Sequence, residues 1–326
     1  MNNLISIITP VKNVSKWIGE TYLSIKNQTH TNWEWIIIDD HSTDDTYLIL
    51  QELQLQDARL KIQHANQKGI IPALQQAFDL TTGDFITRMD GDDLMPETRL
   101  ATMLERYLKS DNDGIVTGKV RYFSKEKVSD GYLKYEKWLN QLVDDQSHYA
   151  HIYRECVVAS PNWMMKRSTA KEILLFEQLQ YPEDYNMCFQ WLQADLPILT
   201  VKEPTLLWRE HPQRTSRNSD VYQQESFFRL KLNWFQKLHP DQSIGILGYG
   251  TKGKLAAKIL NELNREVEVY VHDTQTLVDD ELRKFKKADA LNTDLLLISI
   301  FPPNLTLIEK QLEESGYVIG KNAYYL

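Results

Sequence analysis

Short apolar runs, most of which end in polar or acidic groups, alternate with helix-like segments over the first 93 residues of this chain. The strand-like runs are residues 4–10, 33–40, 59–65 and 84–90, and the helix-like segments between them are residues 15–28, 44–56 and 70–80. The runs are short and rich in β-branched residues, while the segments repeat apolar positions at helical spacing. This alternation predicts a mostly parallel α/β sheet flanked by helices.

Polar side chains gather at the predicted ends of these strands. In parallel α/β sheets the carboxyl ends of the strands share one edge, and ligands bind there. Unrelated acidic turns would have no reason to share an edge, so we expect a functional site. Its candidate residues are Thr9, Asp39, Asp40, Asp90 and Asp92.

The segment ITRMDGDD, residues 86–93, carries three of the acids. Asp90, Asp92 and Asp93 repel one another when crowded, and such a cluster usually needs a cation. Oxygen ligands favour Mg²⁺ or Mn²⁺, and such an ion can neutralise a diphosphate leaving group. Taken alone, a solvated acidic turn explains DGDD equally well.

Composition narrows the class of protein. A net charge of −8 argues against a nucleic-acid partner. Cys156 and Cys188 have apolar neighbours and no metal-like spacing, which predicts buried thiols in a reducing compartment. No apolar run approaches the ~18–20 residues that span a bilayer, and the N-terminus does not read as a signal peptide. We therefore expect a cytoplasmic protein.

The chain divides by composition near residue 240. All 8 tryptophans precede that point, and Leu238–Asp241 contains a helix-stopping proline. We predict two domains, residues 1–238 and 241–326. The second begins with a strand that runs into Gly248, Gly250 and Gly253, spaced GxGxxG, followed by a helix, a strand and Asp273.

The GxGxxG spacing in this context is the dinucleotide-binding fingerprint of Rossmann folds. It makes Gly248, Gly250, Gly253 and Asp273 a candidate second nucleotide site for an NAD-like ligand. The domain is about half the usual size, however, and a small Rossmann-like scaffold that binds nothing is the favoured interpretation.

Five segments, in this order, resemble motifs of family-2 inverting glycosyltransferases of the GT-A fold. They are ISIITPVKN, WEWIIIDDHSTDDT, GDFITRMDGDDLMPETRL, YPEDYNMCFQWL and LLWREHPQRTSR, between residues 5 and 217. The resemblance implies a GT-A-like mixed, mostly parallel sheet flanked by helices. The small C-terminal Rossmann-like α/β domain lies outside it.

The resemblance also implies roles in binding a nucleotide-diphospho-sugar, with a UDP-sugar favoured. Thr9 and Asp40 would contact the nucleoside, and Asp39 would bind ribose or brace its loop. Asp90 would meet the ribose or the metal, Asp92 would ligate the metal, and Asp93 would support the turn. The diphosphate and metal would be held by the late segment with Arg209, His211, Arg214 and Ser216.

Asp184 is the candidate general base, with Glu183 orienting the acceptor or the base. Inverting transfer needs one carboxylate to deprotonate the acceptor hydroxyl. Asp184 would lie near the N-terminus of a helix, where the macrodipole stabilises a carboxylate. Without the resemblance, two ordinary helix N-terminal acids would be the favoured interpretation.

Other residues remain open. Trp163 is equally an acceptor-stacking ring or a core residue, and Arg88 is interpreted as a surface or supporting residue. Leu74, Gln75 and Gln190 stand where the family often has other residues, including arginines, which puts the identity of the donor in doubt.

The predicted function is metal-dependent inverting transfer of a sugar to a glycan or lipid-linked hydroxyl, in bacterial surface polysaccharide synthesis. Peripheral contact with the inner face of the membrane and homo-oligomerisation stay open. A nucleotidyltransferase is disfavoured, because the loop PVKNVSKW has no glycine. The other alternative is a non-catalytic nucleotide-sugar or dinucleotide sensor that acts through the C-terminal domain.

Overall fold

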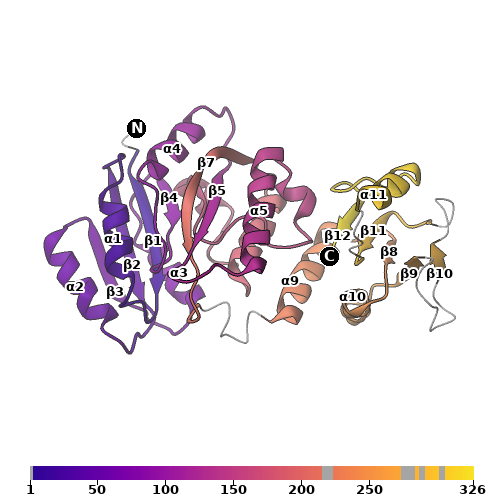
Figure 1. The fold of residues 1–326 in the computed structure, drawn as a ribbon, viewed down its shortest axis with the longest axis horizontal. Helices are drawn as coiled ribbons and strands as arrows, with labels where there is room; N and C mark the ends of the chain where they lie inside the picture. The colour runs from indigo at the N-terminus through magenta and orange to yellow at the C-terminus, as the bar shows by residue number, and fades with distance from the viewer. Residues whose placement is uncertain (1–2, 215–222, 273–282, 286–290, 301–304) are drawn as a thin grey trace. The chain divides into compact units, whose positions relative to one another are not determined.

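The computed structural model describes residues 3–214, 223–272, 283–285, 291–300 and 305–326 (Figure 1). Contacts within the chain divide it into two compact units. The first unit is Met1–His148 with Val158–Asn218, and the second is Tyr149–Val157 with Ser219–Leu326. The predicted domain boundary at residues 238–241 stays a prediction.

The first unit contains a seven-stranded sheet in the order β3-β2-β1-β4-β6-β5-β7. Its strands are β1 (Ile5–Val11), β2 (Trp33–Asp39), β3 (Leu60–His64), β4 (Phe85–Arg88), β5 (Ile115–Phe123), β6 (Met164–Lys166) and β7 (Ile198–Arg209). The short β6 is antiparallel to β4 and β5, and the other pairings are parallel. The predicted mixed, mostly parallel sheet is confirmed.

Seven helices are described with this sheet. They are α1 (Ile18–Lys26), α2 (Thr46–Gln56), α3 (Ile70–Asp79), α4 (Arg99–Leu108), α5 (Asp130–Asp145), α6 (Arg167–Glu172) and α7 (Glu183–Gln193), and the 3-10 helix η1 (His148–His151) follows α5. Helix α3 packs on β1 and β2, while α4 and α5 pack on β5 and β7. All of β2 is buried, because its run of apolar residues belongs to a parallel strand covered on both faces.

Strand register brings the predicted acids together. Val11 at the end of β1 pairs with Asp39 at the end of β2, and Ile8 of β1 pairs with Arg88 at the end of β4. The residues that follow these three strands therefore emerge at one edge of the sheet. This edge carries the candidate site.

The second unit contains a five-stranded parallel sheet in the order β10-β9-β8-β11-β12. Its strands are β8 (Ile244–Leu247), β9 (Val267–His272), β10 (Arg283–Phe285), β11 (Leu295–Ile298) and β12 (Ala323–Tyr325), and its helices are α9 (Gln224–Leu238), α10 (Thr251–Glu262) and α11 (Leu305–Glu314). Buried side chains such as Leu247, Tyr270 and Leu296 form its core.

Among the described residues, none of the helices combines the length and the apolar character that crossing a bilayer requires.

Candidate active site

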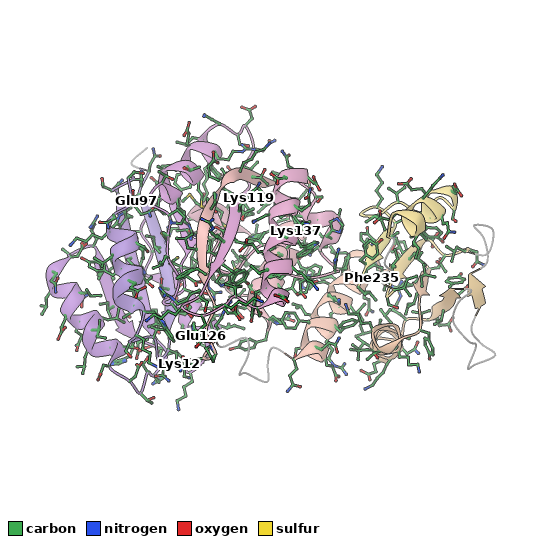
Figure 2. The ribbon with its side chains drawn as sticks, in the orientation of Figure 1. Lys12, Glu97, Lys119, Glu126, Lys137 and Phe235 are labelled. Carbon is green, nitrogen blue, oxygen red and sulfur yellow. The ribbon has the colours of Figure 1, made fainter. Side chains whose placement is uncertain are left out.

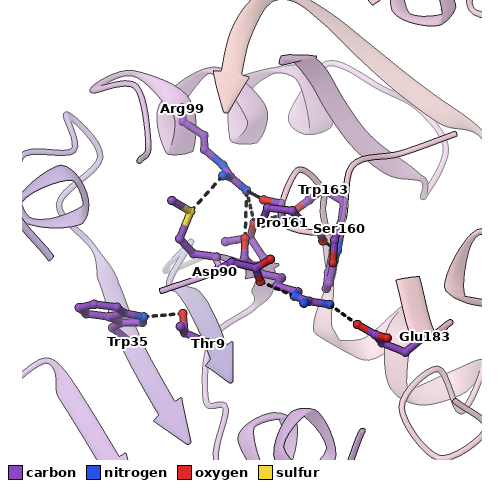
Figure 3. A network of polar contacts seen from close by, with 11 residues as sticks. Thr9, Trp35, Asp90, Arg99, Ser160, Pro161, Trp163 and Glu183 are labelled. Atoms are coloured by element: carbon purple, nitrogen blue, oxygen red, sulfur yellow. Dashed lines mark hydrogen bonds and ion pairs between the residues drawn. The ribbon is translucent and has the colours of Figure 1, made fainter. Parts of the chain in front are cut away.

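The nucleoside candidates lie where β1 and β2 end. Thr9 is fully buried, and its hydroxyl accepts a hydrogen bond from the indole of Trp35 at 2.7 Å (Figure 3). Asp40 is 7% exposed and accepts a hydrogen bond from the backbone N–H of Gly69 at 2.9 Å. Lys12, labelled in Figure 2, reaches its second oxygen at 3.4 Å. Asp40 therefore ties the loop before α3 to the end of β2.

Asp39 is fully buried beside Asp40. Its Oδ2 accepts a hydrogen bond from the Ser42 backbone at 3.2 Å and lies 3.1 Å from Nδ1 of His64. The His64 ring stacks on Tyr47, with centroids 3.7 Å apart. These contacts support the role of Asp39 in bracing the loop, and its contact with ribose stays a prediction.

The three carboxylates of the acidic turn after β4 have different partners. Asp90 Oδ1 accepts a hydrogen bond from Nε of Arg88 at 2.7 Å (Figure 3). Asp92 Oδ2 lies 2.8 Å from Nε2 of His211. Asp93 is 1% exposed, and its Oδ1 accepts the backbone N–H of Arg209 at 2.7 Å. Asp92 and Asp93 therefore both contact the end of β7 or the segment that follows it, whereas Asp90 pairs with Arg88.

Burial and mutual repulsion both act on this turn. Burial raises the pKa of Asp93 well above the usual range, and the Asp92 charge adds to that effect. Burial and Asp92 also raise the pKa of Asp90, although the Arg88 guanidinium opposes them. A site that disfavours its own negative charges in this way is suited to a cation.

The first turn of α1 joins the acidic turn to the late Arg-x-His segment. The Arg209 guanidinium pairs with Glu20 at 2.6 Å and donates through Nε to the carbonyl of Asp92 at 2.6 Å. Trp17 stacks on His211, with ring centroids 3.9 Å apart. The Thr21 hydroxyl lies 3.0 Å from the carbonyl of Gly91. Sequence reasoning missed Trp17 and Glu20, because their spacing signals only an amphipathic helix.

Arg214 lies near the same turn. Although burial disfavours its charge, Tyr122 and the carboxylates of Asp93 and Asp92 raise the pKa of this guanidinium. Ser216, the other predicted residue of this segment, lies outside the described residues.

Arg88 links the acidic turn to α7, which begins at Glu183 and so has Asp184 in its first turn. The Arg88 side chain is 4% exposed. It donates from Nη1 to Glu183 Oε1 at 3.1 Å and from Nε to Asp90 Oδ1 at 2.7 Å. The interpretation of Arg88 as a supporting residue fits this geometry, but the arginine is buried and bridges two predicted site residues. The only sequence signal was its place two residues before Asp90.

The two acids at the start of α7 differ in their surroundings. Glu183 is 2% exposed and paired with Arg88, whereas the neighbouring Asp184 is partly exposed. Burial and the Glu183 charge raise the pKa of Asp184 to about 7, against the lowering effect of Arg88. A carboxylate poised near neutral pH is suited to general-base chemistry.

Trp163 lies in the core of the first unit. It is 2% exposed, and its indole donates to the carbonyl of Ser160 at 2.9 Å (Figure 3). Its ring packs edge-on against that of Trp191. A ring in this position has no open face for a sugar, so we do not carry Trp163 into the proposed acceptor site.

Asp92 and His211 are the residues of this edge that fit a divalent metal ion. Within the described ranges, no cluster of three or more His, Cys, Asp or Glu side chains is arranged to hold a metal. Asp92 and His211 form a pair at 2.8 Å, and none of the described residues forms a hydrogen bond with the buried Nδ1 of His211. A carboxylate and an imidazole are suitable ligands, with further positions left for phosphate oxygens and water. The Asp92–His211 pair fits a metal ion that a donor diphosphate would also ligate. Asp90 is engaged in its ion pair with Arg88.

The glycine turn of the second unit has distinct steric roles. Gly248 has φ +102°, a conformation that favours glycine. A Cβ at Gly253 would lie 2.1 Å from the Gly248 carbonyl, whereas a Cβ at Gly250 would meet none of the described residues within 4 Å. The turn therefore permits close packing of α10, and the described part of the unit leaves space at Gly250. Asp273 lies outside the described residues.

The mixed, mostly parallel sheet and the acidic turn at its edge agree with the GT-A resemblance of the sequence. The family model described as "Glycosyl transferase family 2" matches residues 6–174, which is 169 of 326 residues. The chain belongs to glycosyl transferase family 2.

Curated relatives agree with this assignment. The chain is 31% identical over 123 residues to glycosyltransferase GlyG of Streptococcus pneumoniae, covering 37% of this chain and 41% of the relative. It is 35% identical over 103 residues to the putative teichuronic acid biosynthesis glycosyltransferase TuaG of Bacillus subtilis, covering 31% and 41%. The matches thus span about two-fifths of the length of these relatives.

Solved structures share the fold. TarS of S. aureus (residues 1–349), solved with UDP-GlcNAc, has a TM-score of 0.54 at 18% identity, covering 79% of this chain and 71% of that one. The mannosyltransferase PcManGT of Pyrobaculum calidifontis, solved with GDP-Man and Mn²⁺, has a TM-score of 0.55 at 17% identity, covering 79% and 70%. The GT-A fold predicted from the motifs is confirmed.

Proposed function

We propose that this protein is a metal-dependent inverting glycosyltransferase that uses a nucleotide-diphospho-sugar, with a UDP-sugar as the favoured donor. The observation that carries the proposal is the division of roles between adjacent acids. Arg88 holds buried Glu183, while Asp184 is partly exposed with its pKa raised to about 7. Of these two neighbours, Asp184 is the accessible one, and its raised pKa suits a general base.

The donor would lie along the edge where β1, β2 and β4 end. Asp40 and Asp39 would face the nucleoside, Asp92 and His211 would hold the metal, and Arg209 and Arg214 would face the diphosphate. A bound metal would neutralise the charge that develops on the departing diphosphate. The UDP-GlcNAc complex of TarS and the Mn²⁺ complex of PcManGT support this class of donor and metal.

In the proposed transfer step Asp184 acts as the general base. Its carboxylate takes the proton of the acceptor hydroxyl as that oxygen forms a bond to the anomeric carbon. The bond between that carbon and the diphosphate oxygen breaks, and the nucleoside diphosphate leaves with the electron pair. Attack opposite the leaving group inverts the anomeric configuration. The teichuronic acid relative supports an acceptor in surface polysaccharide synthesis, a glycan or a lipid-linked sugar.

Calorimetric titration of UDP with Mn²⁺, and again with EDTA, tests the proposal. We expect binding that depends on Mn²⁺, weakens at least about tenfold in Asp92→Asn as a charged metal ligand is lost, and persists in Gly250→Val. Gly250→Val is the matched control, because this position has open space in the second unit. Binding that ignores EDTA and Asp92→Asn but is lost in Gly250→Val would support a C-terminal nucleotide sensor instead.

The second unit carries a separate candidate role. Its five parallel strands and its glycine turn support a Rossmann-like domain, as predicted from the GxGxxG spacing. The order of strands, with β8 and β11 adjacent at the centre, forms a topological switch point of the kind at which such sheets bind nucleotides. Binding of an NAD-like ligand there stays a prediction, for which a titration of NAD into wild type and Gly250→Val is the test.

A further inference from the structure

Two ionisable residues pair at the ends of neighbouring strands. His64 is the last residue of β3, and it lies in register with Asp39, the last residue of β2 (Figure 1). Nδ1 of the His64 ring lies 3.1 Å from Oδ2 of Asp39. Because β3 runs parallel to β2, both residues reach the edge of the sheet at which the donor is proposed to bind.

The imidazole ring of His64 is held at one nitrogen and on one face. Asp39 Oδ2 also accepts the backbone N–H of Ser42 at 3.2 Å, which fixes the carboxylate that holds Nδ1. The Tyr47 ring of α2 stacks on His64, with centroids 3.7 Å apart and an interplanar angle of 18°. A side chain restrained in this way loses less entropy when a ligand binds it.

Asp39 and His64 differ in their access to a ligand. The Asp39 side chain is 1% exposed, whereas that of His64 is 57% exposed. Among the described residues, neither the buried Oδ1 of Asp39 nor Nε2 of His64 has a hydrogen-bond partner. A ligand at this edge can therefore reach the imidazole of His64, while the carboxylate of Asp39 stays behind it.

The carboxylate of Asp39 also sets the chemistry that His64 presents. A carboxylate beside Nδ1 favours a proton on that nitrogen, so Nε2 is an acceptor in the neutral ring and a donor in the protonated ring. A hydroxyl group can donate to the first form and accept from the second. Hydroxyl groups therefore match Nε2 of His64 in either protonation state, and the ribose of a nucleoside carries them at its 2′ and 3′ positions.

We propose that His64 is a contact residue for the ribose of the donor, with Asp39 and Tyr47 as the residues that position its ring. The inference rests on the proposed function and assigns the ribose contact to His64 in place of Asp39, which acts through the imidazole. Asp40 stays the residue predicted to face the base. Such a site prefers a ribonucleotide to the form that lacks the ribose hydroxyls.

The test compares UDP with 2′,3′-dideoxy-UDP, which lacks both hydroxyls, by calorimetry in the presence of Mn²⁺. We expect wild type to bind UDP about three- to tenfold more tightly than the dideoxy form, the usual net contribution of one hydrogen bond. His64→Phe keeps a ring that can stack on Tyr47 but has no Nε2. It should bind the two ligands within about twofold of each other, because its affinity for UDP falls and its affinity for the dideoxy form does not.

A second comparison tests whether Asp39 acts through His64. Asp39→Asn weakens the hold on Nδ1 and should lower UDP affinity by at least about twofold when His64 is present. In the His64→Phe background the same substitution should change nothing. A direct contact between Asp39 and the ribose would persist in that background, so further weakening there would contradict the positioning role.

Gln63→Ala is the matched control. Gln63 precedes His64 on β3, and its side chain points to the opposite face of the sheet. This variant should discriminate between the two ligands as wild type does. Equal weakening of UDP and dideoxy-UDP by His64→Phe would show a contact with the base or a merely structural role, and it would overturn the inference. Discrimination that persists unchanged in His64→Phe would overturn it as well.

These results are distinct from failure of the proposed function. If wild-type protein binds no UDP or other nucleoside diphosphate with Mn²⁺, both the proposed function and the ribose contact are wrong. If wild type binds UDP and dideoxy-UDP equally well, the proposed function stands and His64 does not contact the ribose.

Discussion

At the scale of single residues, the site depends on Arg88, whose ion pairs among the described residues include Glu183 but not its neighbour Asp184. The guanidinium pairs with Glu183 at 3.1 Å and with Asp90 at 2.7 Å. Removing one partner from such a buried network leaves an uncompensated charge, which costs several kcal/mol. Asp184 is outside these pairs; burial and the Glu183 charge raise its pKa, and the Arg88 charge lowers it.

The pH dependence of turnover follows from Asp184. Its pKa is raised to about 7, and a general base must be ionised. Turnover should therefore fall as the pH drops through about 7. Arg88 lowers this pKa, so Arg88→Met should move the acid limb of the kcat profile to higher pH by about 1 unit. Release of UDP from a UDP-sugar, followed across pH, measures the shift.

Arg121→Met is the control for this prediction, since it removes a positive charge from an exposed position on β5. Its acid limb should match that of wild type. An acid limb that stays in place in Arg88→Met, while activity remains measurable, would separate Arg88 from the base.

At the scale of elements, α1 organises the acidic turn. The hydroxyl of Thr21 lies 3.0 Å from the carbonyl of Gly91 and 2.9 Å from the carbonyl of Asp93, and the same turn of helix supplies Glu20 to Arg209. Gly91 itself approaches β1 closely, because a Cβ there would lie 2.8 Å from Cγ1 of Val11. The acidic turn is thus hydrogen-bonded to α1 and packed against the end of β1.

Loss of the Thr21 hydroxyl should loosen this turn. The Thr21 hydroxyl has one proton for the carbonyls of Gly91 and Asp93. Thr21→Val removes that donor from a buried site, which costs about 1–3 kcal/mol. We expect a lower urea midpoint and weaker Mn²⁺-dependent UDP binding, both measured on the same preparation. Thr21→Ser keeps the hydroxyl and should retain both properties. Wild-type UDP affinity in Thr21→Val would show that the helix does not position the turn.

The elements themselves differ in how well sequence predicts them. The runs that became β1, β2, β3 and β4 were predicted within one or two residues. Three of them, β1, β2 and β4, are buried parallel strands and form nearly continuous apolar segments, whereas β3 is a partly exposed edge strand. Strand β6, Met164–Lys166, is three residues long and shows no periodicity. Strand β10, Arg283–Phe285, is equally short and carries two cations. Such strands are defined by their neighbours in the sheet.

At the scale of the whole molecule, parallel topology explains why the acids of the site were predictable. Residues that follow parallel strands reach one edge whatever the intervening helices contain. The arrangement around them was not predictable in the same way. Arg88 meets Glu183 across 95 positions, and Arg209 meets Glu20 across 189. Contacts of this range come from tertiary packing, and no local pattern signals them.

The same limit applies to the rings that contact Arg214 and to Trp163. Tyr132 and Trp208 belong to segments that read locally as an amphipathic helix and an apolar strand, so their shared contact with Arg214 emerges only in the folded chain. Trp163 was equally an acceptor ring or a core ring by sequence, and its 2% exposure places it in the core.

The central claim is that Asp184 is the base of a sugar-transfer reaction, and Asp184→Asn tests it most directly. UDP release from a UDP-sugar and UDP affinity with Mn²⁺ are measured on the same sample. We predict that turnover falls by about 10²–10⁴-fold, the usual contribution of general-base catalysis, while UDP affinity stays within about twofold of wild type. Turnover that persists at the wild-type rate in Asp184→Asn would contradict the account.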